Sequence, residues 1–138
     1  MKLLTDSSAL AKRYVAENGS EILHQLLLNA SELAVCIILA PEILSALNRR
    51  LREKNISSHE YSKLKKQLLN DIHDTTVLQL TPSVVSGAVN LLETNVLRAM
   101  DALHVACALE WQAELFATAD KRQLQAAENA GLRTEFVG

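Results

Sequence analysis

A continuous apolar run is the feature that most constrains how this chain can fold. Residues 33–39 are Leu-Ala-Val-Cys-Ile-Ile-Leu, with no polar side chain among them. Strands that are buried on both faces have this composition, and such strands are typical of parallel sheets. Pro41 follows in the position of a first helical turn, where its missing N–H is not needed. The run therefore predicts a buried parallel strand over residues 33–39 that leads into a helix.

The rest of the chain repeats this alternation. Short apolar segments predict further strands at residues 3–5, 76–80, 115–119 and 134–137, and segments with helical periodicity lie between them. Strands that alternate with helices or helix pairs favour an α/β fold with a mainly parallel sheet. We therefore expect a three-layer α/β/α sandwich with four or five central strands. A chain of 138 residues is about one domain, so we expect a single domain over residues 1–138.

Composition excludes several classes of protein. A net charge of −2 and 22% charged residues fit neither a disordered chain nor a strongly basic nucleic-acid coat. No apolar run reaches the roughly 18 residues that span a bilayer, and Asp6 interrupts the apolar start of the chain. Cys36 and Cys107 lie in apolar segments, which indicates buried thiols in a reducing compartment. We expect a cytoplasmic protein without a membrane segment.

Four carboxylates are predicted to meet at one edge of the sheet. Asp6 follows the first predicted strand, Asp120 follows the fourth, and Glu42 lies in the first turn of the helix after the second. A helix that feeds a parallel strand runs antiparallel to it, so the helix that begins near residue 99 returns Asp101 to the same edge. Ligands of open α/β sheets bind at this carboxyl edge.

Each of these acidic residues also has a purely structural explanation, because acids are favoured at helix N-caps and in first turns. Four carboxylates close together, however, repel one another unless a cation lies between them. Oxygen ligands without a Cys/His cluster favour Mg²⁺ or Mn²⁺ over zinc. We therefore expect Asp6 and Asp101 to be the principal metal ligands of a catalytic site, with Glu42 and Asp120 completing it.

Neighbouring polar residues have two interpretations each. The hydroxyls of Ser8 and Thr118 are placed to bind a water, a carboxylate or a phosphate, and backbone capping explains them equally well. We expect His104 to be a structural histidine, because water activated by a metal needs no imidazole. Arg98 lies three residues before Asp101 and is predicted to pair with it.

Four segments together resemble a known family. Thr5-Asp6-Ser7-Ser8-Ala9-Leu10 at the first strand, Pro41-Glu42 at a helix start, Arg98-Ala99-Met100-Asp101-Ala102-Leu103-His104 and Phe116-Ala117-Thr118-Ala119-Asp120 resemble, in order and spacing, the acidic motifs of PIN-domain proteins of the VapC toxin type. The chain departs from many relatives at Ala16-Glu17-Asn18, where they carry prolines. The resemblance implies a PIN-like fold and a Mg²⁺-dependent ribonuclease whose acidic site is Asp6, Glu42, Asp101 and Asp120. It also implies a toxin with a cognate antitoxin, and a homodimer.

Charge distribution indicates where RNA would bind. Residues 45–70 contain seven Lys or Arg against two Glu, a net charge of +5, which leaves −7 on the rest of the chain. Arg49 and Arg50 are the predicted substrate-binding residues, since such a strip can hold RNA phosphates by counterion release. A solvated helical face explains the strip equally well.

Two other functions remain to be compared with the nuclease. One is a PIN-like protein-interaction module that has lost catalysis, against which the four intact acids argue. The other is a phosphatase with an aspartate nucleophile, which would need Asp-x-Asp where this chain has Asp6-Ser7-Ser8. Leu26, Leu27, Leu28 and Tyr61 are candidates for the surface that binds a second copy or an antitoxin helix, although core packing also accounts for them.

Overall fold

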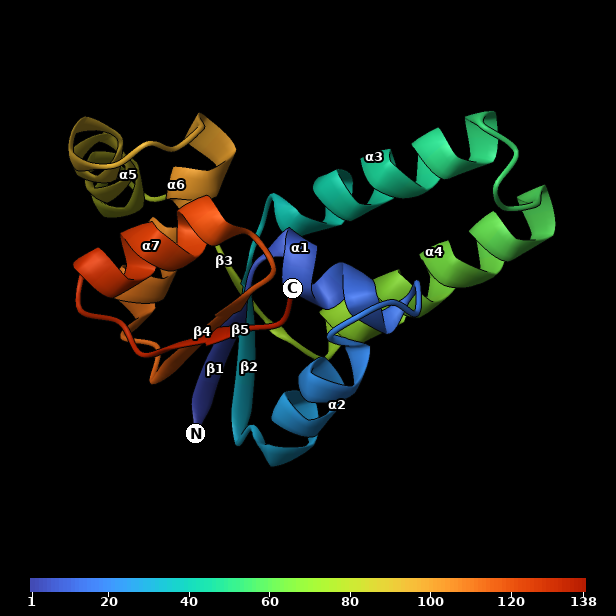
Figure 1. Cartoon of the computed structure of the whole chain (residues 1–138), viewed down its shortest axis with the longest axis horizontal. Helices are drawn as coiled ribbons and strands as arrows, with labels where there is room; N and C mark the ends of the chain where they lie inside the picture. Colours follow the sequence, from blue (N-terminus) through green and yellow to red (C-terminus); the bar gives the residue numbers. More distant parts are fainter.

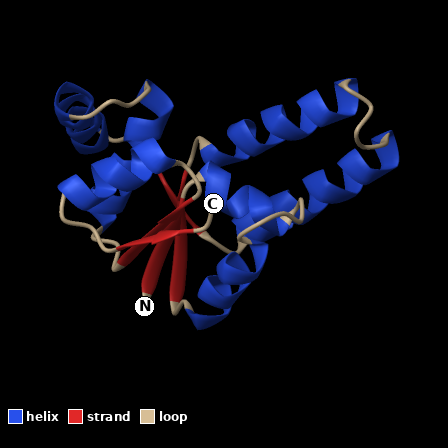
Figure 2. Ribbon diagram, in the orientation of Figure 1, coloured by secondary structure: helices blue, strands red, loops and turns tan.

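A five-stranded parallel sheet lies between two layers of helices in the computed structural model, which describes all 138 residues (Figures 1 and 2). The strands are β1 (Lys2–Thr5), β2 (Glu32–Cys36), β3 (Thr76–Leu78), β4 (Leu115–Thr118) and β5 (Thr134–Phe136). Their order in the sheet is β3-β2-β1-β4-β5, and every neighbouring pair is parallel. The helices are α1 (Ser7–Leu10) with a 3₁₀ turn (Ala11–Arg13), α2 (Ser20–Asn29), α3 (Leu39–Arg52), α4 (Ser58–His73), α5 (Pro82–Thr94), α6 (Ala99–Trp111) and α7 (Lys121–Asn129). The predicted α/β sandwich is confirmed.

Alternate side chains of the strands pack on opposite faces of the sheet, as the period of two along a strand requires. Leu4, Cys36 and Phe116 pack with α5, α6 and α7 on one face. Leu3 and Leu115 are buried on the other face, in a cluster that includes side chains of α1 and α2. Because both faces are covered, the central strands β1, β2 and β4 are apolar except at their ends.

Helices α3 and α4 form a hairpin that extends away from the sheet (Figure 1). Leu39, Ile43 and Leu47 recur at helical spacing and are buried, and they share a cluster with Leu68 of α4. Ser57 caps α4: its side chain accepts from the Glu60 N–H, while the Glu60 carboxylate accepts from the Ser57 N–H. The hairpin carries the basic residues of the 45–70 stretch.

The buried strand is shorter than the sequence predicts. β2 ends at Cys36, and the Ile37 N–H still donates to Leu78 of β3, but α3 begins at Leu39, two residues before Pro41. Leu39, the first residue of α3, is apolar and as fully buried as the end of β2, because it packs in the cluster against α4. Periodicity cannot separate a buried strand from a buried helical turn in so short a run.

The strand order reverses between β1 and β4. From β1 the chain moves outward through β2 and β3, and it then returns to the other side of β1 to form β4 and β5. Such a reversal leaves a crevice at the carboxyl ends of the two strands, where α/β proteins bind their ligands. Asp6 directly follows β1, and Asp120 lies two residues beyond β4. None of the helices has both the length and the apolar character that crossing a membrane requires.

Candidate active site

Asp6 is a buried carboxylate whose hydrogen-bond partners are all neutral. Its side chain accepts from the Ala9 N–H at 2.8 Å, from the Ser8 hydroxyl at 2.8 Å and from the Thr118 hydroxyl at 2.6 Å, and its solvent exposure is 0%. Burial raises the pKa of Asp6, and the hydrogen bonds and the positive charge of His104 only partly oppose this. A negative charge at this position therefore lacks a paired cation.

The hydroxyls of Ser8 and Thr118 serve both roles that the sequence allows. Each donates to Asp6 and also accepts a backbone N–H: Ser8 from Ala119 at 3.0 Å, and Thr118 from Asp120 at 3.0 Å. They join the end of β1 to the end of β4, and they fix the orientation of the Asp6 carboxylate.

Glu42 is held by two residues from other elements. Its Oε1 accepts from the Ser7 hydroxyl at 2.7 Å and lies 2.5 Å from Nε2 of the buried His104. Burial by itself would raise the pKa of Glu42, but the hydrogen bonds with His104 and Ser7 outweigh it and lower that pKa. Burial would likewise lower the pKa of His104, yet its bond to Glu42 and the charge of Asp6 raise it. His104 therefore positions Glu42 by linking α6 to α3.

Asp101 and Asp120 are connected through Gln123. The Gln123 side chain donates to Oδ1 of Asp101 at 3.2 Å, while the Gln123 backbone N–H donates to Oδ1 of Asp120 at 3.2 Å. Arg98 contacts Asp101 through its Nε at 3.5 Å, which confirms the predicted pair. Oε1 of Gln123 is buried without a partner, and it is therefore a further oxygen available beside the two carboxylates.

The four acids thus lie at the carboxyl edge of the sheet, where hydrogen bonds join them into two groups, one with Asp6, Asp101 and Asp120 and one with Glu42. Thr118 connects Asp6 to Asp120, Gln123 connects Asp120 to Asp101, and His104, one helical turn after Asp101, contacts Glu42. No three Asp, Glu, His or Cys side chains, however, come together closely enough to hold a metal ion as they stand. The structure gives their shared location, and the assignment of metal ligands stays a prediction.

Most of the chain matches one protein family. The PIN domain matches residues 3–129, which include all four acids. The chain belongs to the PIN domain family. No curated protein matches this PIN domain in sequence.

Solved structures share the PIN fold over nearly the whole chain. FitAcB from Neisseria gonorrhoeae superposes with a TM-score of 0.73 at 14% identity, covering 96% of this chain and 95% of that one. DNA-bound VapBC from Salmonella typhimurium superposes with a TM-score of 0.73 at 13% identity, covering 100% of this chain and 99% of that one. VapC20 from Mycobacterium tuberculosis is described as a toxin that cleaves the sarcin-ricin loop. It superposes with a TM-score of 0.68 at 16% identity, covering 94% of this chain and 95% of that one. At these identities the likeness concerns the fold alone.

The donor groups of this PIN domain fit a hard divalent cation. All four acidic side chains offer oxygen ligands, and Asp6 is a buried carboxyl group whose hydrogen-bond partners are all neutral. In addition, Glu42 and Asp120 each keep one carboxylate oxygen free, since their hydrogen bonds use only Oε1 and Oδ1. A divalent cation at this edge would supply the positive charge that the carboxylates lack.

The two predicted substrate-binding arginines differ in their surroundings. Arg49 is exposed on α3 and lies seven residues after Glu42, which places it on the same helix face, about 10 Å further along the axis. Arg50 is half-buried, and its Nε has no hydrogen-bond partner. Of the two arginines, Arg49 is therefore the more accessible to solvent.

Sequence reasoning missed three contacts of this site. Ser7 donates to Glu42, Gln123 bridges two acids, and His104 has Glu42 as its partner. Each contact joins residues far apart in the sequence, so no local pattern signals it. The only available signal is that Ser7 and Gln123 each stand within three residues of an acid that sequence reasoning had already selected.

Proposed function

We propose that this PIN domain is a metal-dependent endoribonuclease, and that it works as the toxin of a toxin–antitoxin pair in the cytoplasm. The observation that carries the proposal is the gathering of four acids at the switch point of the sheet, among which Asp6 is buried and forms no ion pair. Membership of the PIN family and the toxin–antitoxin neighbours support it.

In this proposal the metal ligands are Asp6, Asp101, Glu42 and Asp120, and the ion is Mg²⁺ or Mn²⁺. A bound divalent cation lowers the pKa of water and stabilises charge on the phosphate during phosphodiester cleavage. The chain's own contribution is to hold the acids in place. Ser8 and Thr118 orient Asp6, His104 and Ser7 orient Glu42, and Gln123 orients Asp101.

Removal of divalent metal should abolish cleavage of RNA. We expect the purified protein to cut total RNA in Mg²⁺, to stop when EDTA is in excess, and to recover when Mg²⁺ is restored, because the acids then repel the phosphate. Gel analysis of the RNA checks this, with Asp6→Asn protein purified in parallel as the control for contaminating nucleases. Undiminished cleavage in EDTA would show that cleavage does not depend on a divalent metal ion.

Reversal of one charge on α3 should weaken RNA binding. Arg49→Glu is expected to lower affinity for single-stranded RNA about tenfold and to reduce the slope of log K against log salt by about 1 to 2. Fluorescence anisotropy at several salt concentrations measures both quantities. Arg133→Glu is the matched control, because Arg133 is exposed at the start of β5, on the opposite edge of the sheet. Equal losses in the two variants would show that net charge alone matters.

An antitoxin and a second copy of the chain are the proposed protein partners. Several of the most similar structures are toxin–antitoxin complexes, including VapBC2 from Rickettsia felis. On this chain Leu28 of α2 is 77% exposed, while Leu26, Leu27 and Tyr61 are partly buried against the core. Leu28 is thus the member of that predicted surface with the most area to offer a partner helix.

The competing function is a PIN-like interaction module without catalysis. It shares the fold and the partner surface, so only turnover separates it from the nuclease. The hydrogen bonds that hold the four acids at one edge favour the nuclease, since a module that only binds proteins has no need to bury the Asp6 carboxyl group among them.

A further inference from the structure

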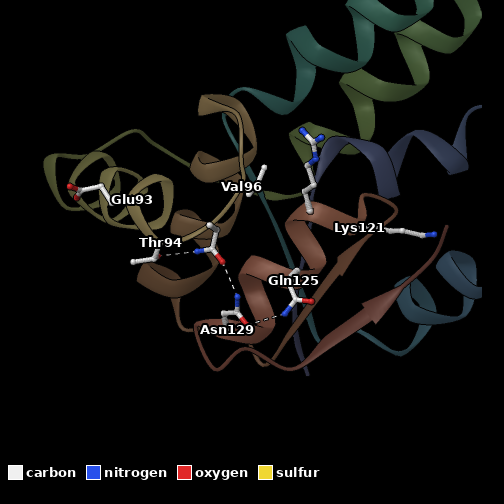
Figure 3. A pocket seen from close by; sticks show the side chains of 8 residues that line it. Glu93, Thr94, Val96, Lys121, Gln125 and Asn129 are labelled. Atoms are coloured by element: carbon white, nitrogen blue, oxygen red, sulfur yellow. Dashed lines mark hydrogen bonds between the residues drawn. The ribbon is translucent and has the colours of Figure 1, made fainter.

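A polar hollow of about 560 Å³ lies beside the acidic edge, between the end of α5 and α7 (Figure 3). Its lining consists of Glu93, Thr94, Asn95, Val96, Lys121, Arg122, Gln125 and Asn129. Seven of these eight residues are polar or charged, and Val96 is 77% exposed. The hollow has the volume of a small-molecule site, but its lining is far more polar than is usual for one.

The chain connects this hollow directly to the acids of the proposed active site. Lys121 and Arg122 follow Asp120 at the start of α7, and the segment from Asn95 leads through Arg98 to Asp101. Neither Lys121 nor Arg122 forms an ion pair. Two free positive charges next to an acidic site are suited to hold a phosphate that the carboxylates would otherwise repel.

A directed chain of side-chain amides crosses the hollow. Gln125 donates to Oδ1 of Asn129 at 2.9 Å, Asn129 donates to Oδ1 of Asn95 at 2.9 Å, and Asn95 donates to the Leu91 carbonyl at 3.1 Å. Figure 3 shows Gln125 and Asn129 side by side on α7, facing the segment that carries Thr94 and Val96. Each bond fixes which end of an amide is oxygen and which is nitrogen. At the Gln125 end of this series of amides, the Oε1 atom and one N–H group of Gln125 therefore have no hydrogen-bond partner.

We infer that this hollow binds one nucleotide of a single-stranded RNA substrate, next to the phosphodiester bond that is cut. Lys121 and Arg122 contact its phosphate, and the free oxygen and N–H of Gln125 contact the edge of its base. The backbone of Gln125 lies one helical turn, about 6 Å, beyond Lys121, so one nucleotide can reach both. The inference rests on the proposed function, and it assigns that function a base-contacting subsite.

An acidic peptide is the other ligand that two cations would attract, but it would leave the oriented amides without a role. A base, in contrast, presents donors and acceptors side by side along its edge, as the free end of Gln125 does. The nucleotide therefore accounts for both the charges and the amide chain.

Binding of mononucleotides tests the inference without any need for RNA cleavage. The four ribonucleoside 5′-monophosphates, inorganic phosphate and a short polyglutamate peptide are titrated separately into the ¹⁵N-labelled protein in EDTA. We expect nucleotides to shift the backbone amides of Lys121 and Arg122 together with the side-chain amides of Gln125 and Asn129, and phosphate to shift the backbone amides alone. The absence of shifts at millimolar nucleotide would overturn the inference. So would side-chain shifts that phosphate or the peptide reproduces.

Variants separate the two halves of the subsite. Arg122→Ala is expected to weaken nucleotide and phosphate binding alike, by about tenfold, whereas Gln125→Ala weakens nucleotide binding and leaves phosphate binding unchanged. Arg133→Ala and Gln25→Ala are the matched controls, because both residues are exposed and lie outside the hollow. Equal losses in a variant and its control would contradict the assignment.

Cleavage then distinguishes this inference from the proposed function. If the protein cuts RNA, Gln125→Ala should change the bases found at the cut ends while cleavage continues, and sequencing of those ends measures it. An unchanged set of ends would overturn the base contact. If the protein cuts no RNA at all, the proposed function fails, and the titrations alone decide whether the hollow binds nucleotides.

Discussion

Asp6→Asn is expected to lower the rate of RNA cleavage by at least about 100-fold, while the protein stays folded. Loss of a group that only orients a metal ligand typically costs 10- to 100-fold, and a principal ligand should cost at least as much. An asparagine offers one neutral oxygen where Asp6 offers a charged carboxylate. Single-turnover cleavage of a labelled RNA in Mg²⁺ measures the effect.

The fold should survive this substitution for a physical reason. Asp6 caps α1 by accepting from the Ala9 N–H, and asparagine caps helices as well as aspartate does. Burial also raises the pKa of Asp6, so its charged form destabilises the folded state, and the neutral amide removes that cost. We therefore expect a Tm equal to or above that of the wild type.

Asp74→Asn is the matched control for this experiment, because the Asp74 side chain is 85% exposed at the end of α4. It should cleave RNA at the wild-type rate. Full activity of Asp6→Asn would refute the assigned site. A lowered Tm would instead show that the carboxylate stabilises the fold.

Gly19→Ala is expected to lower the free energy of unfolding by about 2–5 kcal/mol. Gly19 has a φ of +90°, which costs an alanine about 1–2 kcal/mol. An added Cβ would also lie 1.8 Å from the backbone oxygen of Val137, so the chain end must move, and overpacking of this kind costs about 1–3 kcal/mol. Urea denaturation at 25 °C measures the change.

Gly131→Ala isolates the steric part of this loss. Gly131 has nearly the same φ, +91°, but nothing lies within 4 Å of the Cβ that alanine would add. Its substitution should cost only the conformational part, about 1–2 kcal/mol. Equal losses at the two glycines would mean that Val137 gives way without cost, and that the contact between its carbonyl and Gly19 does not stabilise the fold.

Local patterns in the sequence determine most of the fold. The continuous apolar runs of the strands, the acids at helix starts such as Asp6, and the alternation of strands with helices are all local patterns, so they can be recognised without a structure. They also place Asp6, Glu42, Asp101 and Asp120 at one edge, because parallel strands end on the same side. Where a strand and the helix after it are equally buried, as at residues 36–39, the hydrophobic pattern does not predict the boundary between them.

Tertiary structure alone decides which side chains meet. His104 contacts Glu42 across 62 residues, Thr118 contacts Asp6 across 112, and Asn129 contacts Asn95 across 34. Such contacts depend on how helices pack on the sheet, to within a hydrogen-bond length, and no local periodicity encodes that distance. The sequence by itself therefore determines which edge of the sheet carries the chemistry. Only the packing of α3, α6 and α7 decides how each acid is held there.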